Sequence, residues 1–274
     1  MLQDKVIGIY CKVDDILKGI SHPEHKDRRV SDSEIITTAI LSALYFKGNQ
    51  CSAINYMRTH NMSPTMVGKS GFCKRIHKVA SLLMWMFLDV GRLFKYVYAE
   101  LECIIDSFPL KVCHNIRISR SKLLKGEQYR GYSVSKREYF YGVKVQLLTL
   151  KDGIPVDMCF VPCSEHDVEA LRKMYFDLPA ESMVYGHSAY TEYTLEELYK
   201  EAECIELKIS RKSNSKRPDK PYQAFIKTAM RKRIETTISQ IIEMTLQSIH
   251  AVTAKGFLLK ILLFVFAYQL KAFI

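Results

Sequence analysis

The sequence has no apolar run long enough to cross a membrane. The longest uncharged run, residues 35–46, has 12 residues, and residues 261–270 form a run of 10 between two lysines. A transmembrane helix needs about 18 or more apolar residues. Charged residues also stand at positions 4 and 5, where the apolar part of a signal peptide would begin. We therefore expect no transmembrane helix, no secretion signal and a cytoplasmic location.

The chain also lacks a Cys-x-x-Cys pair, and its eight cysteines are scattered. In 274 residues this number does not suggest a disulfide scaffold. Cys159, Cys163 and His166 are spaced like part of a zinc site, but no second pair with ligand spacing is present to complete it. We expect buried, reduced thiols instead.

Positive charge is concentrated in two stretches. The chain has 40 Lys and Arg against 29 Asp and Glu, a formal net charge of +11. Residues 111–137 carry +7 and residues 208–233 carry +9, so the rest of the chain is acidic overall. Two basic segments on a balanced body favour a polyanion partner, and the tyrosines interleaved with the first segment suit phosphates and unstacked bases. Two solvated basic loops are the alternative.

Residues 1–98 have helical patterning. Ser31 and Glu34 have the spacing of a capping box, and apolar residues follow at helical intervals. Pro64 breaks the pattern, and a second helical run with a basic flank is predicted over 69–96. Short helices with a basic flank suit a helix-turn-helix reader of DNA or a helical bundle with an ordinary solvated face, and the sequence leaves both open.

From about residue 99 the pattern changes to strands that alternate with helices. The predicted strands cover residues 101–106, 141–147, 154–160, 183–186 and 204–209, with Asp152-Gly153 as a hairpin turn. Helices are predicted over 165–177 and 223–247, and also after Thr194. Ser164 with Asp167, and Thr194 with Glu197, have capping-box spacing. This order predicts a mixed sheet flanked by helices, of the α/β or α+β class.

Two acids stand in positions that suit metal chemistry. Asp106 ends an otherwise apolar strand, where a carboxylate costs free energy unless it meets a cation or hydrogen-bond donors. Glu235 lies on a predicted helix four residues after Arg231, where a solvated ion pair is the simpler interpretation. Acids beside two basic stretches would suit Mg²⁺ bound at a DNA phosphate, because hard cations prefer oxygen ligands. Taken alone, each acid also fits a purely structural role.

Several segments, in the same order, resemble the DDE transposases of bacterial insertion sequences. The matching segments are residues 104–109 (IIDSFP), 113–117, 129–142, 152–156, 188–190, 210–217, 234–237 and 250–254. The resemblance extends less distinctly over the N-terminal third. It implies an RNase H-like mixed sheet in a catalytic domain over 99–274 that ends in helices, preceded by a helical, DNA-binding region over 1–98.

In that family an Asp, a second Asp and a Glu bind two divalent ions, Mg²⁺ or Mn²⁺. The resemblance places the first Asp at Asp106 and the Glu at Glu235. The second Asp is expected directly after a strand, at a position where this sequence has His187. The resemblance therefore predicts Asp106 and Glu235 as surviving metal ligands and His187 as a substituted catalytic position.

Imidazole is a poor replacement for that carboxylate. Two-metal cleavage uses ions about 3.5–4 Å apart, and a bridging carboxylate supplies two oxygens and a negative charge. Neutral imidazole supplies one nitrogen and suits Zn²⁺, Cu²⁺ or Ni²⁺ better than Mg²⁺. We assign Asp152, Asp157 and Asp167 to turn, strand and helix-cap roles rather than to the missing ligand. A decayed copy that keeps its fold and DNA binding is favoured over a site retuned for a transition metal.

The resemblance also implies the substrates. It predicts a transposase that binds terminal inverted repeats of double-stranded DNA, cleaves phosphodiester bonds and joins 3′ ends to target DNA, as a homo-oligomer at the bacterial nucleoid. Arg231 and Arg233 are expected to clamp the scissile strand. The residues expected to bind phosphate are Arg117, Arg120, Lys122, Arg130, Lys136, Arg137, Arg211, Lys212, Lys216 and Arg217. The alternatives are a catalytically inactive DNA-end-binding protein derived from a transposase, and a nuclease that cuts without joining.

Overall fold

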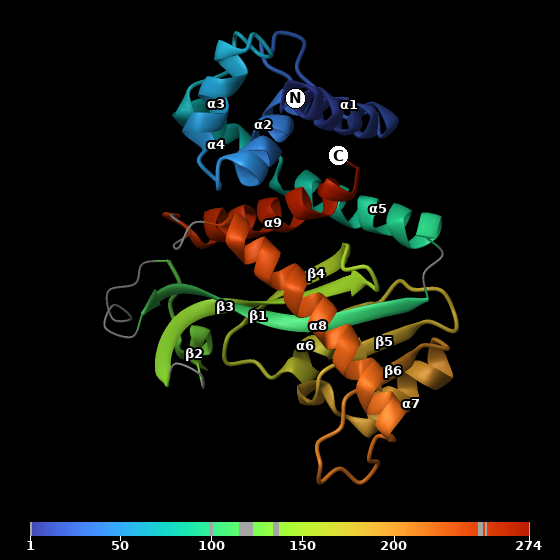
Figure 1. The fold of residues 1–274 in the computed structure, drawn as a ribbon. Coiled ribbons are helices and arrows are strands. Elements are labelled where there is room, and N and C mark those ends of the chain that lie inside the picture. Colours follow the sequence, from blue (N-terminus) through green and yellow to red (C-terminus); the bar gives the residue numbers. More distant parts are fainter. Residues whose placement is uncertain are drawn as a thin grey trace. The chain divides into compact units, whose positions relative to one another are not determined.

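The computed structural model describes residues 2–98, 101–114, 123–133, 137–245, 249 and 251–273 (Figure 1). Nine α-helices and six β-strands lie in these residues. The chain divides into two compact units, one formed by Met1–Asp89 with Ile241–Ile274 and the other by Val90–Gln240. The functional division at residue 98 stays a prediction.

The described part of the first unit is helical, as predicted for the N-terminal region. Its helices are α1 (Leu2–Gly19), α2 (Asp32–Tyr45), α3 (Gln50–Thr59), α4 (Lys69–Lys78), the first half of α5 (Ala80–Tyr98) and α9 (Ala254–Leu270). The predicted capping box is confirmed, because the side chains of Ser31 and Glu34 each accept a hydrogen bond from the other's backbone. The single run predicted over 69–96 is wrong, since the chain leaves helical geometry at Val79 and α5 starts afresh.

Helix α9 supplies much of the apolar core of this unit. It packs against α2, and the aromatic and aliphatic residues of its second half are almost all buried. By length and composition alone, Ala254–Phe273 would also suffice to cross a membrane, which the run lengths in the sequence did not suggest. However, 61% of the apolar window is buried inside the structure. Burial in the core therefore accounts for its hydropathy.

The second unit is built on a mixed six-stranded sheet. Its strands are β1 (Glu102–His114), β2 (Arg130–Ser133), β3 (Glu138–Leu150), β4 (Pro155–Pro162), β5 (Met183–Gly186) and β6 (Glu206–Ile209). β3 pairs antiparallel with β1, β2 and β4, whereas β5 pairs parallel with β1 and β6 pairs parallel with β5. The predicted mixed fold class is confirmed, and the topology agrees with an RNase H-like domain.

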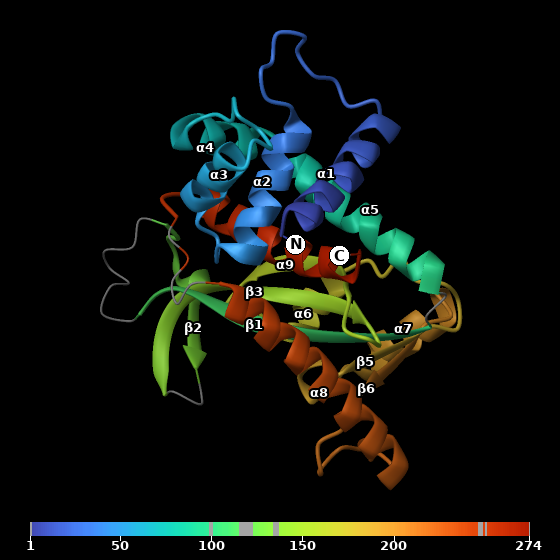
Figure 2. The same cartoon turned by 45° about the horizontal axis from the view of Figure 1, so that its top comes forward.

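Helix α8 (Pro221–Met244) crosses this sheet, as Figures 1 and 2 show. Within the second unit it is held at three points. Lys227 Nζ donates a 2.8 Å hydrogen bond to the carbonyl of Ile209. Ile234 is fully buried, and the Thr237 hydroxyl donates to the carbonyl of Gly153 at 3.0 Å. These contacts fix which residues of α8 face the sheet, and Glu235 follows Ile234 directly.

Two shorter helices, α6 (Asp167–Lys173) and α7 (Tyr193–Ala202), complete the unit. Both predicted caps are wrong: the N-cap residues are His166 and Glu192, and neither side chain bonds to its helix. The backbone N–H of Ser164 donates instead to Gln128, outside the helix. The carboxylate of Asp167 is bound by side chains of the sheet, so it is not available to cap α6.

Candidate active site

Asp106 lies within the central strand β1, between β3 and the end of β5. It is 8% exposed, and it follows Ile105, whose partner in β5 is Gly186, the last residue of that strand. Burial raises the pKa of Asp106, whereas the neighbouring His187 and the backbone N–H of Ser107 lower it, and the charge of Glu235 raises it further. In the described residues its one ion-pair partner is His187. The strand thus presents a buried carboxylate whose charge is little compensated.

His187 follows β5 immediately and caps the short 3-10 helix Ser188–Tyr190. Its Nδ1 accepts a 2.9 Å hydrogen bond from the backbone N–H of Ala189. An imidazole nitrogen that accepts a hydrogen bond carries no proton, so the proton of the ring lies on Nε2. Nε2 is 3.4 Å from Asp106 Oδ1 and 3.9 Å from Asp167 Oδ2. The Nε2 edge of the His187 ring therefore faces two carboxylates.

Glu235 reaches the same region from α8. Its Oε1 is 2.8 Å from Nε of Arg231, one turn earlier, and its side chain is half exposed. Its charge and that of Arg231 both act on the pKa of Asp106, in opposite directions. The structure thus brings Asp106, His187 and Glu235, far apart in the sequence, into one electrostatic neighbourhood.

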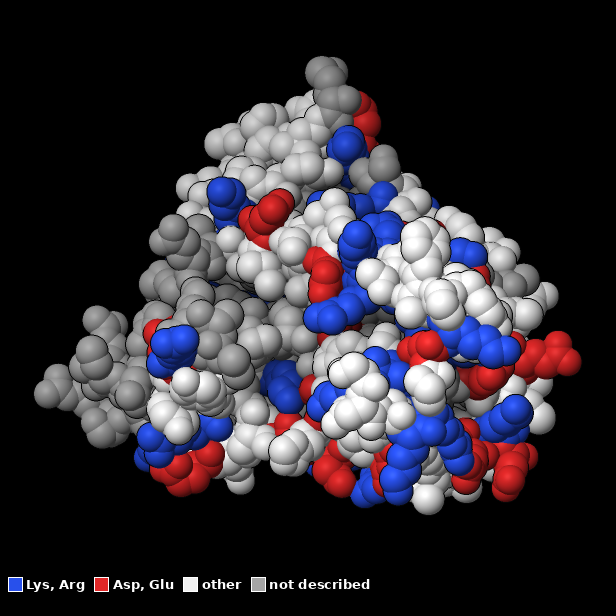
Figure 3. Space-filling view, turned by 60° about the horizontal axis from the view of Figure 1, so that its bottom comes forward, with Lys and Arg blue, Asp and Glu red and all other residues white. Residues whose placement is uncertain are grey.

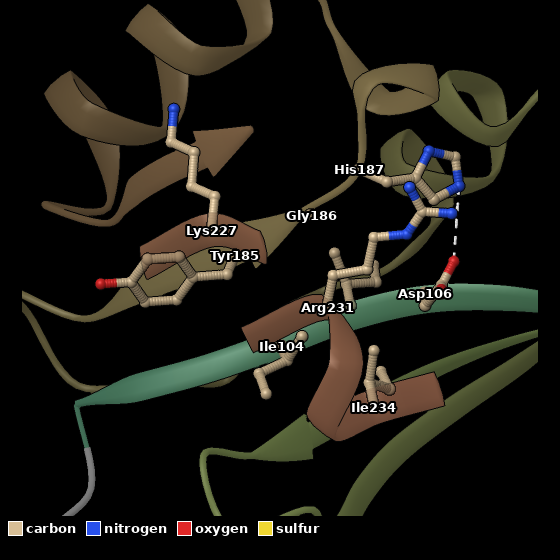
Figure 4. A pocket seen from close by; sticks show the side chains of 9 residues that line it. Ile104, Asp106, Tyr185, Gly186, His187, Lys227, Arg231 and Ile234 are labelled. Atoms are coloured by element: carbon tan, nitrogen blue, oxygen red, sulfur yellow. Dashed lines mark ion pairs between the residues drawn. The ribbon is translucent and has the colours of Figure 1, made fainter. Parts of the chain in front are cut away.

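A small pocket lies where these elements meet. It is lined by Ile104, Ile105, Asp106, Tyr185, Gly186, His187, Lys227, Arg231 and Ile234. Figure 4 shows the Arg231 side chain extending from α8 over β1 toward Asp106 and His187. Gly186 permits the close approach of the strands, because a Cβ there would lie 2.9 Å from Ile209 Cδ1. Asp106, His187 and Arg231 lie together at one side of the pocket, and Lys227 lies at the other (Figure 4).

Asp167 is a member of this neighbourhood that the sequence reasoning missed. Its Oδ1 accepts hydrogen bonds from Ser107 Oγ at 3.0 Å, Lys144 Nζ at 2.9 Å and Gln146 Nε2 at 3.2 Å. Burial acts to raise the pKa of Asp167, but the hydrogen bond and charge of Lys144 outweigh it and lower the pKa. The signal for it was present in β3, where Lys144 and Gln146 interrupt an apolar strand and need a polar partner.

The carboxylates of the pocket are spread rather than gathered around one point. In the described ranges, one trio of His, Cys, Asp or Glu has its ligand atoms within 4.8 Å of one another, namely His22, Glu24 and Asp32. That trio lies in the first unit. Both oxygens of Asp32 already face cations, because Arg28 is 2.6 Å from one and Arg75 binds the other. We interpret this trio as a structural network that ties α4 to the start of α2.

The basic residues predicted at phosphate divide into three groups. Arg117, Arg120, Lys122 and Lys136 lie outside the described residues. Arg211 forms an ion pair with Glu196, with 2.7 Å between Nη1 and Oε1, and both side chains are nearly buried. Arg217 forms an ion pair with Glu197, with 2.6 Å between Nη2 and Oε1. The remaining residues, Arg130, Arg137, Lys212, Lys216, Arg231 and Arg233, are exposed or half-buried.

Positive side chains do not form one continuous surface on the face shown in Figure 3, where Lys and Arg lie among Asp and Glu. Arg130 illustrates this, because it faces Glu127 at 3.4 Å and stacks over Tyr139 at 4.5 Å. Arg231 is likewise paired with Glu235. The net charge of the two basic stretches is thus partly neutralised by acids from elsewhere in the unit.

The zinc interpretation of Cys159, Cys163 and His166 gains no support. Burial raises the pKa of the Cys159 thiol to about 11 and that of Cys163 to about 12. Thiols with such pKa values stay protonated at neutral pH, whereas zinc binds the thiolate. All eight cysteines are free. The expectation that these thiols are buried is wrong for most of them, because only Cys103 is buried, and Cys11, Cys73 and Cys204 are exposed.

An RNase H-like mixed sheet with a buried carboxylate on its central strand, beside the end of the parallel strand β5, suits a nuclease or transposase that acts on DNA. A family model described as "Transposase DDE domain" matches residues 99–252, more than half of the chain. The chain therefore belongs to the DDE-domain transposases, which confirms the resemblance. No curated protein and no solved structure matches the chain. The family acts on DNA by nuclease and transposition-type chemistry and generally uses divalent metal.

The donor set fits such a metal in part. Asp106 and Glu235 offer the hard oxygen ligands that Mg²⁺ and Mn²⁺ prefer, and Asp106 is a buried carboxylate short of positive charge. His187 does not fit as a ligand through Nε2, because its Nδ1 accepts the Ala189 N–H and Nε2 keeps its proton. His187 thus turns an N–H, rather than a free lone pair, toward Asp106.

Proposed function

We propose that this protein is an insertion-sequence transposase that binds terminal inverted repeats, cleaves them and joins the 3′ ends to target DNA, and that His187 impairs this copy. The observation that carries the proposal is the pocket itself. Asp106 and His187 line it 3.4 Å apart, and the charge of Glu235 acts on Asp106 from α8. Family membership supplies the class of chemistry, and the pocket supplies a place for it.

Asp106 and Glu235 are the residues of this chain that would hold a divalent cation. When bound, such a cation neutralises a scissile phosphate and makes a bound water or hydroxyl more acidic. In cleavage, the water oxygen bonds to phosphorus, the bond from phosphorus to the 3′ oxygen breaks, and a 3′-hydroxyl is released. In joining, that hydroxyl attacks a target phosphodiester and displaces the target's own 3′ oxygen.

Basic side chains at the pocket suit the phosphates of the same strand. Arg231 lines it from α8, and Arg233 of the same helix lies next to Gly153. Lys212 and Lys216 stand exposed in the loop before α8. Phosphate contacts of this kind position DNA without reading its sequence.

Replacing His187 with Asp is the experiment that tests the proposal. An Asp at this position would restore a carboxylate beside Asp106 and still accept the Ala189 N–H as an N-cap. We expect His187→Asp to raise Mg²⁺-dependent cleavage of a terminal-repeat duplex by about 10³-fold or more, since several kcal/mol of metal-dependent stabilisation is at stake at about 1.4 kcal/mol per decade. His187→Asn is the matched control, because Asn has the shape of Asp and can accept the Ala189 N–H but carries no negative charge.

Three results would contradict the proposal. Wild-type cleavage as fast as that of the His187→Asp variant would show that His187 does not impair the copy. No cleavage by His187→Asp, with DNA-end binding intact, would favour the inactive end-binding protein instead. Cleavage without transfer of 3′ ends to a target duplex would identify a nuclease on the same fold. Adding Glu235→Gln to His187→Asp should abolish whatever cleavage is gained.

A further inference from the structure

The two oxygens of Asp167 have different surroundings. Three donors, from Ser107, Lys144 and Gln146, all reach Oδ1. Oδ2 faces His187 Nε2 at 3.9 Å, which is beyond hydrogen-bond distance. The side chain is only 14% exposed. The structure thus anchors one oxygen firmly and aims the other at the site of Asp106.

The His187 ring stands between Asp167 and Asp106. Its protonated Nε2 lies 3.4 Å from Asp106 Oδ1 and 3.9 Å from Asp167 Oδ2. Asp106 and Ser107 are successive residues of β1, so their side chains leave opposite faces of the strand. Asp167 is bonded to the Ser107 hydroxyl and therefore approaches from the face opposite Asp106. At the end of β5 the ring can reach both.

We propose that Asp167 is a carboxylate ligand of this site: Asp106 Oδ1 and Asp167 Oδ2 share a divalent cation, and the His187 ring occupies its place when no metal is bound. The inference rests on the proposed function, because family membership is the reason to expect a metal here. A divalent cation takes carboxylate oxygens at about 2.0–2.6 Å, so binding draws the two acids together and displaces the ring.

Lys144 is the group that competes with such a cation. Its Nζ lies 2.9 Å from Asp167 Oδ1 and also donates to the carbonyl of Glu165 at 2.8 Å. Asp167→Asn and Lys144→Met break the same ion pair from opposite sides. A purely structural Asp167 predicts the same outcome for both variants. A ligand role predicts opposite outcomes, because only Asp167→Asn removes an oxygen charge from the cation.

The test is a titration of the full chain with Mn²⁺, in which the free ion is measured by electron paramagnetic resonance without DNA. We expect Asp167→Asn to weaken Mn²⁺ binding about ten- to hundredfold. Lys144→Met and His187→Ala should bind Mn²⁺ at least as tightly as wild type, because the first removes a competing charge and the second removes the ring. Asp152→Asn, a change in an exposed turn, is the control and should bind as wild type does.

Three outcomes would overturn the inference. In the first, Asp167→Asn binds Mn²⁺ as wild type does, whereas Asp106→Asn loses binding. This result would exclude Asp167 as a ligand and leave the proposed metal site at Asp106 intact. In the second, neither Asp167→Asn nor Asp106→Asn changes Mn²⁺ binding, which would exclude the proposed metal site itself. Weaker binding by His187→Ala would make the ring a ligand. If Asp167→Asn unfolds because Lys144 is left unpaired, the double variant Asp167→Asn, Lys144→Met removes that charge and answers the same question.

Discussion

Asp157 in β4 is a carboxylate whose charged form lowers the stability of the fold. It is partly buried, and burial raises its pKa to about 6, with the charge of Asp177 adding to the effect while Lys95 opposes it. Its Oδ1 accepts a 2.7 Å hydrogen bond from the N–H of Met158. Replacing Asp157 with Asn removes the charge and keeps the shape and this acceptor, so it isolates the electrostatic cost.

The size and sign of the effect follow from the pKa. An acid whose pKa is raised in the folded state binds its proton more tightly when folded, so it destabilises the fold as pH rises from about 4 to about 6. A shift of about two units from the unfolded value corresponds to about 3 kcal/mol, and partial exposure reduces this to about 2 kcal/mol. Asp157→Asn should therefore raise the unfolding free energy by about 2 kcal/mol at pH 7.5 and change it little at pH 4.

Urea unfolding of both proteins at the two pH values measures this difference. Hydrogen exchange of the β4 amides, residues 155–162, shows whether the gain lies in the second unit. Asp152→Asn, in the exposed turn before β4, is the matched control and should change stability by less than about 0.5 kcal/mol. An Asp157→Asn variant that is no more stable than wild type at pH 7.5 would refute the reasoning.

Two further predictions concern DNA and packing. If about eight phosphates are contacted, the logarithm of DNA affinity should fall with the logarithm of salt concentration at a slope of about −7. The Lys212→Ala, Lys216→Ala double variant should reduce the magnitude of that slope by about 2. A salt-independent affinity, measured by fluorescence anisotropy, would contradict DNA binding. Gly91→Ala should destabilise the protein by about 1–3 kcal/mol in thermal unfolding, because a Cβ at Gly91 would collide with the backbone carbonyl of Val156. Gly8→Ala, in a helix where a Cβ meets nothing within 4 Å, should instead stabilise it by about 0.5–1 kcal/mol, and equal effects of the two would contradict the packing argument.

The parts of the fold that depend on residues close together in the sequence could be predicted from the sequence. The Ser31–Glu34 capping box is a local hydrogen-bond pattern, and it forms as predicted. The hairpin at Asp152-Gly153 is also local, and Gly153 adopts the positive φ of 86° that such turns favour. The strand over 183–186 matches its prediction, since its residues are apolar and bounded by turns.

The predicted caps at Ser164 and Thr194 do not form, and for Ser164 the reason lies elsewhere in the fold. Asp167 has capping-box spacing from Ser164, but Lys144 and Gln146 of β3 offer it stronger bonds. Those residues are more than twenty positions away, so no local pattern reveals them. The same distance explains why Asp167 was missed at the candidate site.

The residues of the candidate site came from a family resemblance rather than from physical patterning. Composition alone could not separate a metal-binding Asp106 from a capping one, nor Glu235 from an ordinary ion pair with Arg231. The structure adds the electrostatic contact between them. Their roles as ligands, and those of the basic residues at phosphate, stay predictions.

The turn that follows β5 would accept a carboxylate in place of the His187 side chain. The side chain of its first residue accepts one hydrogen bond, from the Ala189 N–H, and an Asp oxygen accepts such a bond as readily as an imidazole nitrogen does. His and Asp codons differ only in their first base. A single nucleotide exchange would therefore change the charge of the pocket without disturbing the backbone around it.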